Sequence, residues 1–415
     1  MRVSIHTYGT RGDVQPYVAL ALGLKASGHE PLIAAPEQFA DFVTSHGIAF
    51  SPLPGEMLAL IDDPVAQAVL EGSSGFGGGL KLIGRMRPAI GRLLAAEWQS
   101  ASEARPDVLV YHPKSLASPG IAEKLGIRAV LASPLPGFTP TAAFPSPMLP
   151  VRSLGPLNRM SHRLAVEGGE RIYRKEIAQW REAVLGLPVL RQRREPAATL
   201  YAYSPAVLPK PADWSADVHV TGYWFLDGDR SRGLDPALVA FLDAGPPPVY
   251  VGFGSMPSIA AEQRTRMVLS ALEQAGQRGL LAVGGGAMVR MQVPDSVMMI
   301  EGAPHDLLFP RVAAVVHHGG AGSTAAGLRA GRPTVICPFF GDQPFWGRVV
   351  AKAGLGPEPL SRRRLSAEAL AAAIRSAVGS PQIVRRALEV GEAIRAENGV
   401  PQAAAVIESV VDRGI

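Results

Sequence analysis

Hydrophobic positions recur along the chain in short runs that alternate with longer stretches of helical spacing. The short runs are rich in Val, Leu and Ile and end at Gly, Pro or polar residues, which is typical of buried parallel strands. They occupy 3–6, 32–34, 108–111, 129–132 and 200–203 in the first half, and 249–253, 280–283, 297–300, 314–317 and 334–337 in the second. Between the first two runs, apolar residues of 14–27 recur at helical spacing. This alternation predicts an α/β protein with two Rossmann-like domains.

A polar, glycine-containing stretch at 226–234 separates the two sets and predicts the linker between the domains. We expect the first domain over 1–225, the second over 235–382, and a C-terminal helical segment over 383–415 that straps them together. Ligands of doubly wound folds bind beyond the carboxyl ends of the strands. Two such domains facing each other place a cleft between those ends, and the chemistry is expected there.

An irregular stretch at 134–156 follows a predicted strand and is rich in Pro, Phe, Leu and Met. A long loop of this kind inside a domain is usually functional or disordered. Its apolar content favours an acceptor pocket or lid over disorder. The candidate acceptor-binding residues in it are Phe138, Phe144 and Met148.

Composition narrows the functional classes. The length of 415 residues fits two domains, and 47% hydrophobic residues exclude a disordered chain. Cys337 is the one cysteine, which excludes an intrachain disulfide and a cysteine-based metal site and favours the cytoplasm. No apolar window reaches the ~18 residues of a membrane span. The net charge is +5, but the sequence has no basic runs interleaved with aromatic residues, so we expect no nucleic-acid binding. The positive charge is still compatible with a phosphate-bearing substrate or with peripheral contact to a membrane.

The loop after the first predicted strand reads Thr-Tyr-Gly-Thr-Arg-Gly-Asp over 7–13. Glycines such as Gly12 allow a tight turn with the backbone close to a ligand. The loop is neither a GxGxxG nor a P-loop sequence, which disfavours a dehydrogenase. Asp13 stands where a helix N-cap belongs, and it could also remove a proton from a hydroxyl. Both roles stay open. His112 follows another predicted strand and is a further acceptor-binding candidate; it either tunes Asp13 or is an ordinary loop histidine.

The second glycine-rich loop is Val-Val-His-His-Gly-Gly-Ala-Gly-Ser-Thr over 315–324, where a strand turns into a helix at 324–329. Its glycines let the backbone curl around a diphosphate, while Ser323, His318 and the first helical amides supply donors. Alternatively, Ser323 is only an N-cap and His318 a core histidine. The combination of two histidines, three glycines and a serine in one turn favours anion binding.

Further polar residues follow other predicted strands. Asp342 and Gln343 pair an acceptor with a donor, which suits vicinal sugar hydroxyls, although Asp342 could equally be an N-cap. Ser255 and His305 stand in the same relation to the strands before them. No acidic cluster suited to Mg²⁺ lies near the glycine-rich loop, so no metal is expected.

The stretch 303–347 resembles the donor-binding signature of the UDP-glycosyltransferase superfamily, an inverting family with the GT-B fold. GTRGDVQPYVALALGLKASGHE, GFGSM, TGYWFLD, APHD and FFGDQPFWG are most similar to the sterol 3β-glucosyltransferase branch, and bacterial antibiotic glycosyltransferases share much of the pattern. The resemblance implies transfer of a hexose, without a cofactor, from UDP-glucose to a hydroxyl of a sterol, polyketide or flavonoid. A TDP-deoxysugar donor is the alternative. A binding module without transferase activity, or an epimerase of the same architecture, is less favoured.

Carried over by position, the resemblance makes Asp13 the general base. It also implies that Ser255, His318, Gly322 and Ser323 surround the diphosphate, that the Ala303 backbone meets the base, and that Asp342 and Gln343 hold the hexose. The candidate donor-binding set further includes Thr10, Gly12, His305 and Gly320 of the same loops. Gly302 stands where plant-type members carry a base-stacking Trp, and Ala326 where they carry a ribose-binding Glu. Nucleoside recognition must therefore differ, and UDP and TDP both stay open.

Overall fold

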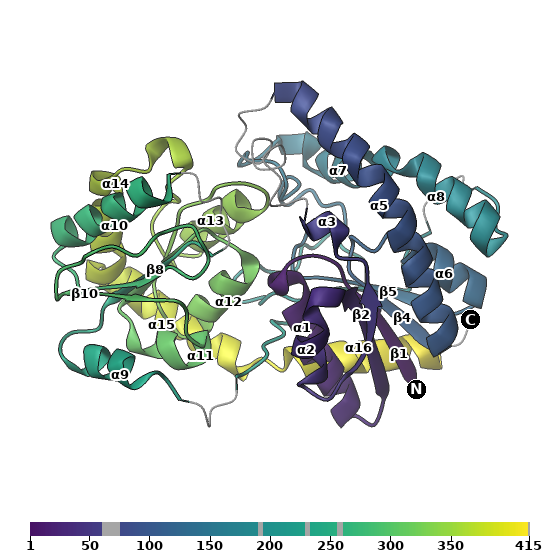
Figure 1. The fold of residues 1–415 in the computed structure, drawn as a ribbon, viewed down its shortest axis with the longest axis horizontal. Helices are drawn as coiled ribbons and strands as arrows, with labels where there is room; N and C mark the ends of the chain where they lie inside the picture. Colours follow the sequence, from purple (N-terminus) through teal and green to yellow (C-terminus); the bar gives the residue numbers. More distant parts are fainter. Residues whose placement is uncertain (60–74, 190–193, 229–232, 255–259, 414–415) are drawn as a thin grey trace.

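Two parallel sheets organise the chain (Figure 1). The structure is a computed structural model that describes residues 1–59, 75–189, 194–228, 233–254 and 260–413, without the side chains of 59 and 75–83. The first sheet has the strand order β3-β2-β1-β4-β5-β6-β7 and the second the order β10-β9-β8-β11-β12. The expectation of two parallel α/β units is confirmed.

The strands are β1 Arg2–His6, β2 Glu30–Pro36, β3 Ala49–Leu53, β4 Val108–Tyr111, β5 Arg128–Ser133, β6 Ala198–Tyr201, β7 Val218–Val220, β8 Val249–Gly252, β9 Gly279–Ala282, β10 Val297–Ile300, β11 Ala314–His317 and β12 Thr334–Ile336. Strands β3 and β7 were not expected from the sequence. Both lie at the edges of the first sheet, where hydrophobic patterning is weakest.

The α-helices of the first unit are α1 Arg11–Ala26, α2 Ala40–Thr44, α3 Glu56–Ala59, α5 Gly75–Ala104, α6 Ser118–Leu125, α7 Asn158–Ile172 and α8 Arg174–Trp180. Those of the rest of the chain are α9 Pro236–Asp243, α10 Ala261–Ala275, α11 His305–Leu308, α12 Ala321–Arg329, α13 Gln343–Lys352, α14 Ala367–Gly379, α15 Pro381–Ala396 and α16 Gly399–Asp412. None of these helices is both long enough and apolar enough to cross a bilayer.

Strand register brings the candidate loops together. His6 at the end of β1 pairs with Ala34 of β2 and with Tyr111 of β4, so the loops after β1 and β4 leave the first sheet side by side. In the second sheet, His317 pairs with Gly252 of β8 and Ile336 of β12. All pairs are parallel, which places the carboxyl ends of neighbouring strands at one edge of each sheet.

The C-terminal segment joins the two units. Helix α15 packs on α12 of the second unit, whereas α16 packs on α1 of the first, which confirms the expected strap. The segment is two helices rather than one continuous stretch, because the chain is extended at Glu397. Gly23 of α1 allows the close approach of α16, since a Cβ there would lie 2.1 Å from Val400 Cγ1. The expected linker 226–234 includes residues outside the described ranges, so its limits stay a prediction.

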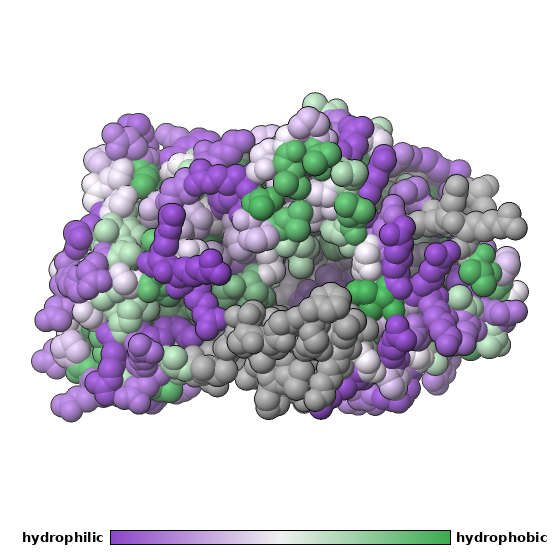
Figure 2. Space-filling view, turned by 90° about the horizontal axis from the view of Figure 1, so that it is seen from above, coloured by the Kyte–Doolittle hydropathy of each residue, from purple (hydrophilic) through white to green (hydrophobic). Residues whose placement is uncertain are grey.

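A mixed aromatic core also connects the units. Tyr201 and Trp214 of the first unit stack with ring centroids 4.8 Å apart, and they belong to the same buried cluster as Trp346 and Val390. Viewed from above, the space-filling surface is hollowed near the middle of the molecule, with apolar side chains beside the hollow (Figure 2). A packed aromatic and aliphatic core therefore joins the two units.

Candidate active site

Asp13 lies in the first turn of α1, directly beyond the carboxyl end of β1. The helix begins at Arg11 and its N-cap is Thr10, so Asp13 is the third helical residue rather than the N-cap that its position in the sequence suggested. The backbone N–H of Thr10 donates to Asp13 Oδ2 at 2.8 Å, and the Thr10 hydroxyl lies 3.3 Å from the same oxygen. Asp13 thus does cap the helix, but from inside it, through a capping box.

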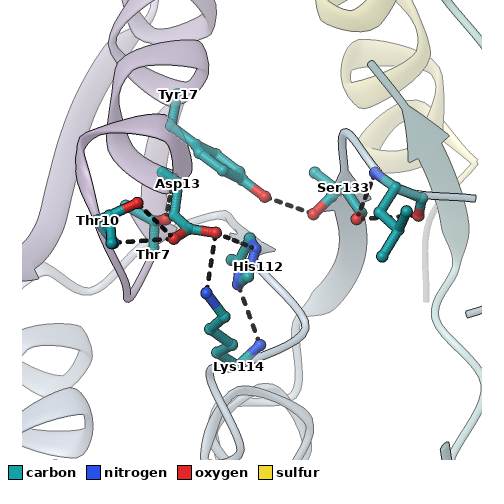
Figure 3. A network of polar contacts seen from close by, with 9 residues as sticks. Thr7, Thr10, Asp13, Tyr17, His112, Lys114 and Ser133 are labelled. Atoms are coloured by element: carbon teal, nitrogen blue, oxygen red, sulfur yellow. Dashed lines mark hydrogen bonds and ion pairs between the residues drawn. The ribbon is translucent and has the colours of Figure 1, made fainter. Parts of the chain in front are cut away.

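Two side chains of the β4–α6 loop hold the other carboxylate oxygen (Figure 3). Lys114 Nζ lies 2.9 Å from Asp13 Oδ1, and His112 Nε2 lies 3.4 Å from the same atom. The expectation that His112 lies near Asp13 is confirmed by this contact. The carboxylate is therefore bound on one side by the α1 turn and on the other by the neighbouring loop.

The tautomer of His112 follows from its second contact. The backbone N–H of Lys114 donates to His112 Nδ1 at 3.1 Å, so Nδ1 carries no proton. Burial lowers the pKa of His112, although Asp13 acts in the opposite direction, and the ring is neutral at pH 7. Its single proton is therefore on Nε2 and is donated to Asp13. His112 orients the carboxylate and does not itself accept a proton there.

Asp13 is ionised throughout the physiological range. Burial raises the pKa of its carboxyl, but the Lys114 ammonium and the His112 hydrogen bond outweigh burial, and the pKa lies well below its usual range. Gly9 makes room for this carboxylate: its φ is +142°, and a Cβ there would lie 2.0 Å from Asp13 Oδ2. The loop is thus shaped around a fixed, negatively charged group.

The second candidate loop forms the turn from β11 into α12. The N-cap of α12 is Gly320, so Ser323 lies within the first turn and is not the N-cap considered from the sequence. No side chain caps this helix, and the space beside Gly322 is open, since a Cβ there would contact nothing within 4 Å. The backbone N–H groups at this end of α12 suit an anion.

His318 lies in the same turn with its ring between two glycines. A Cβ on Gly320 would lie 2.6 Å from His318 Nε2, and one on Gly254 would lie 3.2 Å from its Cε1. Burial lowers the pKa of His318 to about 4, so the ring is neutral, and its Nδ1 has no hydrogen-bond partner among the described residues. His317, in contrast, is a core residue that accepts from the backbone N–H of Gly319 at 2.9 Å.

Asp342 and Gln343 begin α13. Asp342 is the N-cap residue but makes no side-chain cap, and its Oδ2 accepts from the Trp346 indole at 3.1 Å. Burial raises the pKa of Asp342, and the negative charge of Asp13 raises it further. Gln343 is buried, and its Oε1 accepts from the backbone N–H of Phe339 at 2.8 Å, which fixes the loop before the helix.

Charged groups of the two units influence each other's pKa values. Asp342 is influenced by Asp13 and Lys114, and His305 by Arg11 at the start of α1. Burial lowers the pKa of His305 to about 4, and its ring stacks on Phe309 with centroids 4.1 Å apart. The structure therefore brings charged and ionisable candidate groups of both units close enough to influence one another.

The remaining candidate residues for donor and acceptor binding lie in apolar contacts or at the surface. Ala303 is half-buried against the apolar cluster of the second unit. Phe144 packs on Phe345 of α13, with ring centroids 5.3 Å apart, and therefore takes part in the contact between units. Phe138 is half-buried, and Met148 is 54% exposed. Ser255 lies outside the described residues, so its assignment to the donor site stays a prediction.

Lys114 is the site residue that the sequence did not suggest. It contacts Asp13 although 101 positions separate them, because β4 pairs with β1. One sequence feature could have indicated this contact: the run His-Pro-Lys directly follows a buried strand, just as the first loop follows β1. Among the described residues, no group of three or more His, Cys, Asp or Glu side chains could hold a metal ion.

Comparisons with known proteins give the family. The model of the "Glycosyltransferase family 28 N-terminal domain" matches residues 3–144, and that of the "Erythromycin biosynthesis protein CIII-like, C-terminal domain" matches residues 284–412. O-mycaminosyltylonolide 6-deoxyallosyltransferase of Streptomyces fradiae is 35% identical over 433 residues, which cover 98% of this chain and 97% of that protein. The chain belongs to the same glycosyltransferase family as this Streptomyces enzyme.

Sterol enzymes of the glycosyltransferase family are also similar to the chain. Sterol 3-beta-glucosyltransferase UGT80B1 of Arabidopsis thaliana is 34% identical, over 97% of this chain and 67% of that protein. The sterol 3-beta-glucosyltransferase of Cryptococcus neoformans is 34% identical over 97% of this chain, which spans only 27% of its length. The expected resemblance to both branches is confirmed.

Solved glycosyltransferase structures share the fold. The glycosyltransferase of kitacinnamycin matches with a TM-score of 0.75 at 19% identity, over 99% of both chains. VinC, solved in complex with DTDP, matches with a TM-score of 0.69 at 18% identity, over 100% of both chains. These likenesses confirm the expected GT-B fold.

Proposed function

We propose that this glycosyltransferase moves a hexose from a nucleoside diphosphate sugar to a hydroxyl of a hydrophobic acceptor, with inversion at the anomeric carbon. The first unit binds the acceptor and the second binds the donor. The observation that carries the proposal is the fixed, ionised Asp13 at the end of β1, facing a second unit in which α12 begins with uncapped amides beside neutral His318. Family membership supports the reaction class.

The proposed reaction is a single displacement. The acceptor oxygen forms a bond to the anomeric carbon, its proton passes to Asp13, and the bond from the anomeric carbon to the diphosphate oxygen breaks with its electron pair on the leaving group. A carboxylate with a lowered pKa is a weak base towards an alcohol, so proton transfer must accompany attack. The acceptor hydroxyl needs a lone pair on Asp13. Lys114, which is half exposed, is the contact that it displaces most easily.

The second unit stabilises the leaving group in this proposal. Negative charge grows on the diphosphate as the anomeric bond breaks, and preorganised donors stabilise such charge effectively. The first-turn amides of α12 and the His318 ring supply these donors, while Asp342 and Gln343 face the hexose. Glucose is the favoured hexose because the sterol relatives are named glucosyltransferases, and the sequence resemblance favours UDP as its carrier. A TDP-sugar is the alternative, since the structural neighbour VinC was solved in complex with DTDP.

The acceptor class is proposed from the apolar surface of the first unit. Most of the large apolar side chains that the described chain exposes lie between positions 148 and 164: Met148, Val151, Leu154, Leu157, Met160 and Leu164. Such a concentration is typical of a surface that meets an apolar ligand or a membrane. It supports a sterol-like or macrolide acceptor and peripheral contact with a membrane that contains it.

A donor-binding measurement and a product assay test the proposal together. The purified chain is incubated with UDP-glucose or TDP-glucose and with sterol and macrolide alcohols, and glycosides are detected by mass spectrometry. In parallel, calorimetry compares UDP and TDP binding to the wild type, His318→Ala and the control variant His219→Ala, whose half-buried histidine lies in the edge strand β7 of the first unit. Loss of a hydrogen bond to a charged group weakens affinity about ten-fold or more, so we expect this for His318→Ala alone. Unchanged affinity in His318→Ala, or no glycoside with either donor, contradicts the proposal.

A further inference from the structure

A buried polar network lies behind the loop that holds Asp13. Glu97 of α5 and His6 at the end of β1 are both fully buried, and His6 Nδ1 lies 3.5 Å from Glu97 Oε2. The Ser115 hydroxyl, in the loop after β4, donates to the same carboxylate oxygen. Ser118, the first residue of α6, completes the network, because its Oγ lies 2.6 Å from Ser115 Oγ and 3.5 Å from His6 Nδ1.

The hydrogen bonds of this network have one consistent direction. Ser115 uses its single hydroxyl proton on Glu97, so the hydrogen bond between the two serines must be donated by Ser118. Ser118 Oγ is then an acceptor, and His6 Nδ1 carries the proton that faces it. Glu97 is thus the acceptor at the end of the chain of hydrogen bonds, and the orientation of both serines depends on it.

The network is a poor source of stability. Glu97 Oε1 and His6 Nε2 have no hydrogen-bond partner in the part of the chain that the structure describes. Buried polar groups without partners are costly, and well-packed apolar residues in place of buried ionic ones are often neutral or stabilising. A carboxylate in this place therefore indicates a positioning role.

The segment that Glu97 positions is the one that binds Asp13. Ser115 follows Lys114 directly, and its backbone N–H donates to the carbonyl of His112 at 2.8 Å. The backbone N–H of His112 in turn donates to the carbonyl of His6 at 2.8 Å. On the other side of the loop, the Lys114 and His112 side chains bind Asp13 Oδ1 (Figure 3). Because the Lys114 side chain is half exposed, its place depends on the loop backbone that carries it.

We propose that Glu97 is a positioning residue for the base: through Ser115 it fixes the loop from which Lys114 and His112 bind Asp13. Glu97 has no contact with Asp13, since its Oε2 is bound by Ser115 and His6. The inference rests on the proposed function, because it assigns Glu97 a role in that reaction. Without Glu97, the loop is free to move, and Asp13 loses the contacts that keep it ionised and oriented.

The sign of a pH effect separates this role from a direct effect of charge. The other ionisable groups that act on the two carboxyls, or are acted on by them, are Tyr17 and Asp342 for Asp13 and His6 and Tyr8 for Glu97. Removing the negative charge of Glu97 alone would lower the pKa of Asp13, if it had any effect. Loss of the Lys114 and His112 contacts would instead raise the pKa of Asp13, because these contacts lower it.

Two replacements of Glu97 test the proposal. Glu97→Met removes the acceptor, whereas Glu97→Gln removes the charge and keeps an oxygen for the Ser115 hydroxyl. A displacement of about 1 Å can cost about 10²-fold in rate, so we expect kcat to fall at least about ten-fold in Glu97→Met. The acid limb of its kcat/KM profile should move to higher pH. Glu97→Gln should restore most of the lost turnover, and Glu103→Gln, on the exposed side of α5, should match the wild type.

A double variant and a loop variant complete the test. In Glu97→Met combined with Lys114→Met, the acid limb should move by less than the sum of the single shifts, because both changes act on one contact. Ser115→Ala removes the same hydrogen bond from the loop side and should repeat the shift, which decides the matter if thermal unfolding shows that Glu97→Met does not fold. An acid limb that stays in place or moves to lower pH, or shifts that simply add, overturns the proposal.

Failure of this inference can be told from failure of the proposed function. If Asp13→Asn kept the kcat of the wild type, Asp13 would not be the base and the proposed function would be wrong. If Asp13→Asn lost turnover while the acid limb of Glu97→Met and Ser115→Ala stayed in place, only the positioning role of Glu97 would be wrong. Calorimetry with UDP should show unchanged affinity in all Glu97 and Ser115 variants, because both residues belong to the first unit.

Discussion

Gly9 offers the sharpest perturbation of the first loop, because one added carbon reaches the carboxylate of Asp13. A Cβ at Gly9 would lie 2.0 Å from Asp13 Oδ2, whereas ordinary contacts begin at 3.4 Å. In Gly9→Ala the carboxylate must therefore retreat by about 1.4 Å, the difference between these two distances. Misplacing a catalytic group by about 1 Å can cost about 10²-fold in rate, so we expect kcat to fall by at least that factor.

Backbone strain must be separated from this displacement. The φ of Gly9 is +142°, a conformation that disfavours alanine, and a side chain at positive φ costs about 1–2 kcal/mol. Gly28→Ala is the matched control, because Gly28 has a φ of +82° and open space around its missing Cβ. Gly28→Ala should lose stability through backbone strain alone, and Gly9→Ala at least as much, because it also disturbs the capping contact of Asp13.

The assay compares steady-state kcat and nucleotide affinity in the two variants. We expect Gly9→Ala to lose turnover, with nucleotide binding retained, and Gly28→Ala to keep the turnover of the wild type. If Gly9→Ala turned over within a few-fold of the wild type, the position of the Asp13 carboxylate would not matter to the reaction, and the interpretation of the loop would be refuted.

Two further variants test neighbouring parts of the site. Lys114→Met removes a cation that lowers the pKa of Asp13. Because a protonated base is inactive, the acid limb of the kcat/KM profile should move to higher pH, and it should not move in Lys124→Met. Phe144→Ala removes a ring that packs on Phe345, so the first thermal transition should fall, at a cost of about 2–4 kcal/mol; an unchanged transition would show that this contact does not join the units.

The fold could be predicted because its strands are local apolar runs. Each run from 108–111 to 314–317 lies in or beside an observed strand, and the turn after β11 was correctly expected to lead into a helix. Strand β3 was missed because Ala49–Leu53 contains Ser and Pro and is only partly buried. Strand β7 was missed because three residues, Val218–Val220, are too few for a period to be recognised.

Site geometry can be predicted from the sequence only where it depends on residues that are neighbours in the chain. The start of α1 at Arg11 could have been found from the spacing of Thr10 and Asp13, which is that of a capping box. The Lys114–Asp13 contact could not, because it depends on which strand pairs with β1. Likewise, the burial of Gln343 and its bond to the Phe339 backbone arise from the path of the loop before α13.

Asp13→Asn tests the assignment of the base most directly, because it keeps the shape of the side chain and removes its negative charge. If Asp13 receives the acceptor proton, kcat for glycoside formation should fall by about 10² or more, and calorimetry should show that the nucleotide sugar still binds as in the wild type. An Asp13→Asn enzyme with wild-type kcat would contradict the assignment of the base.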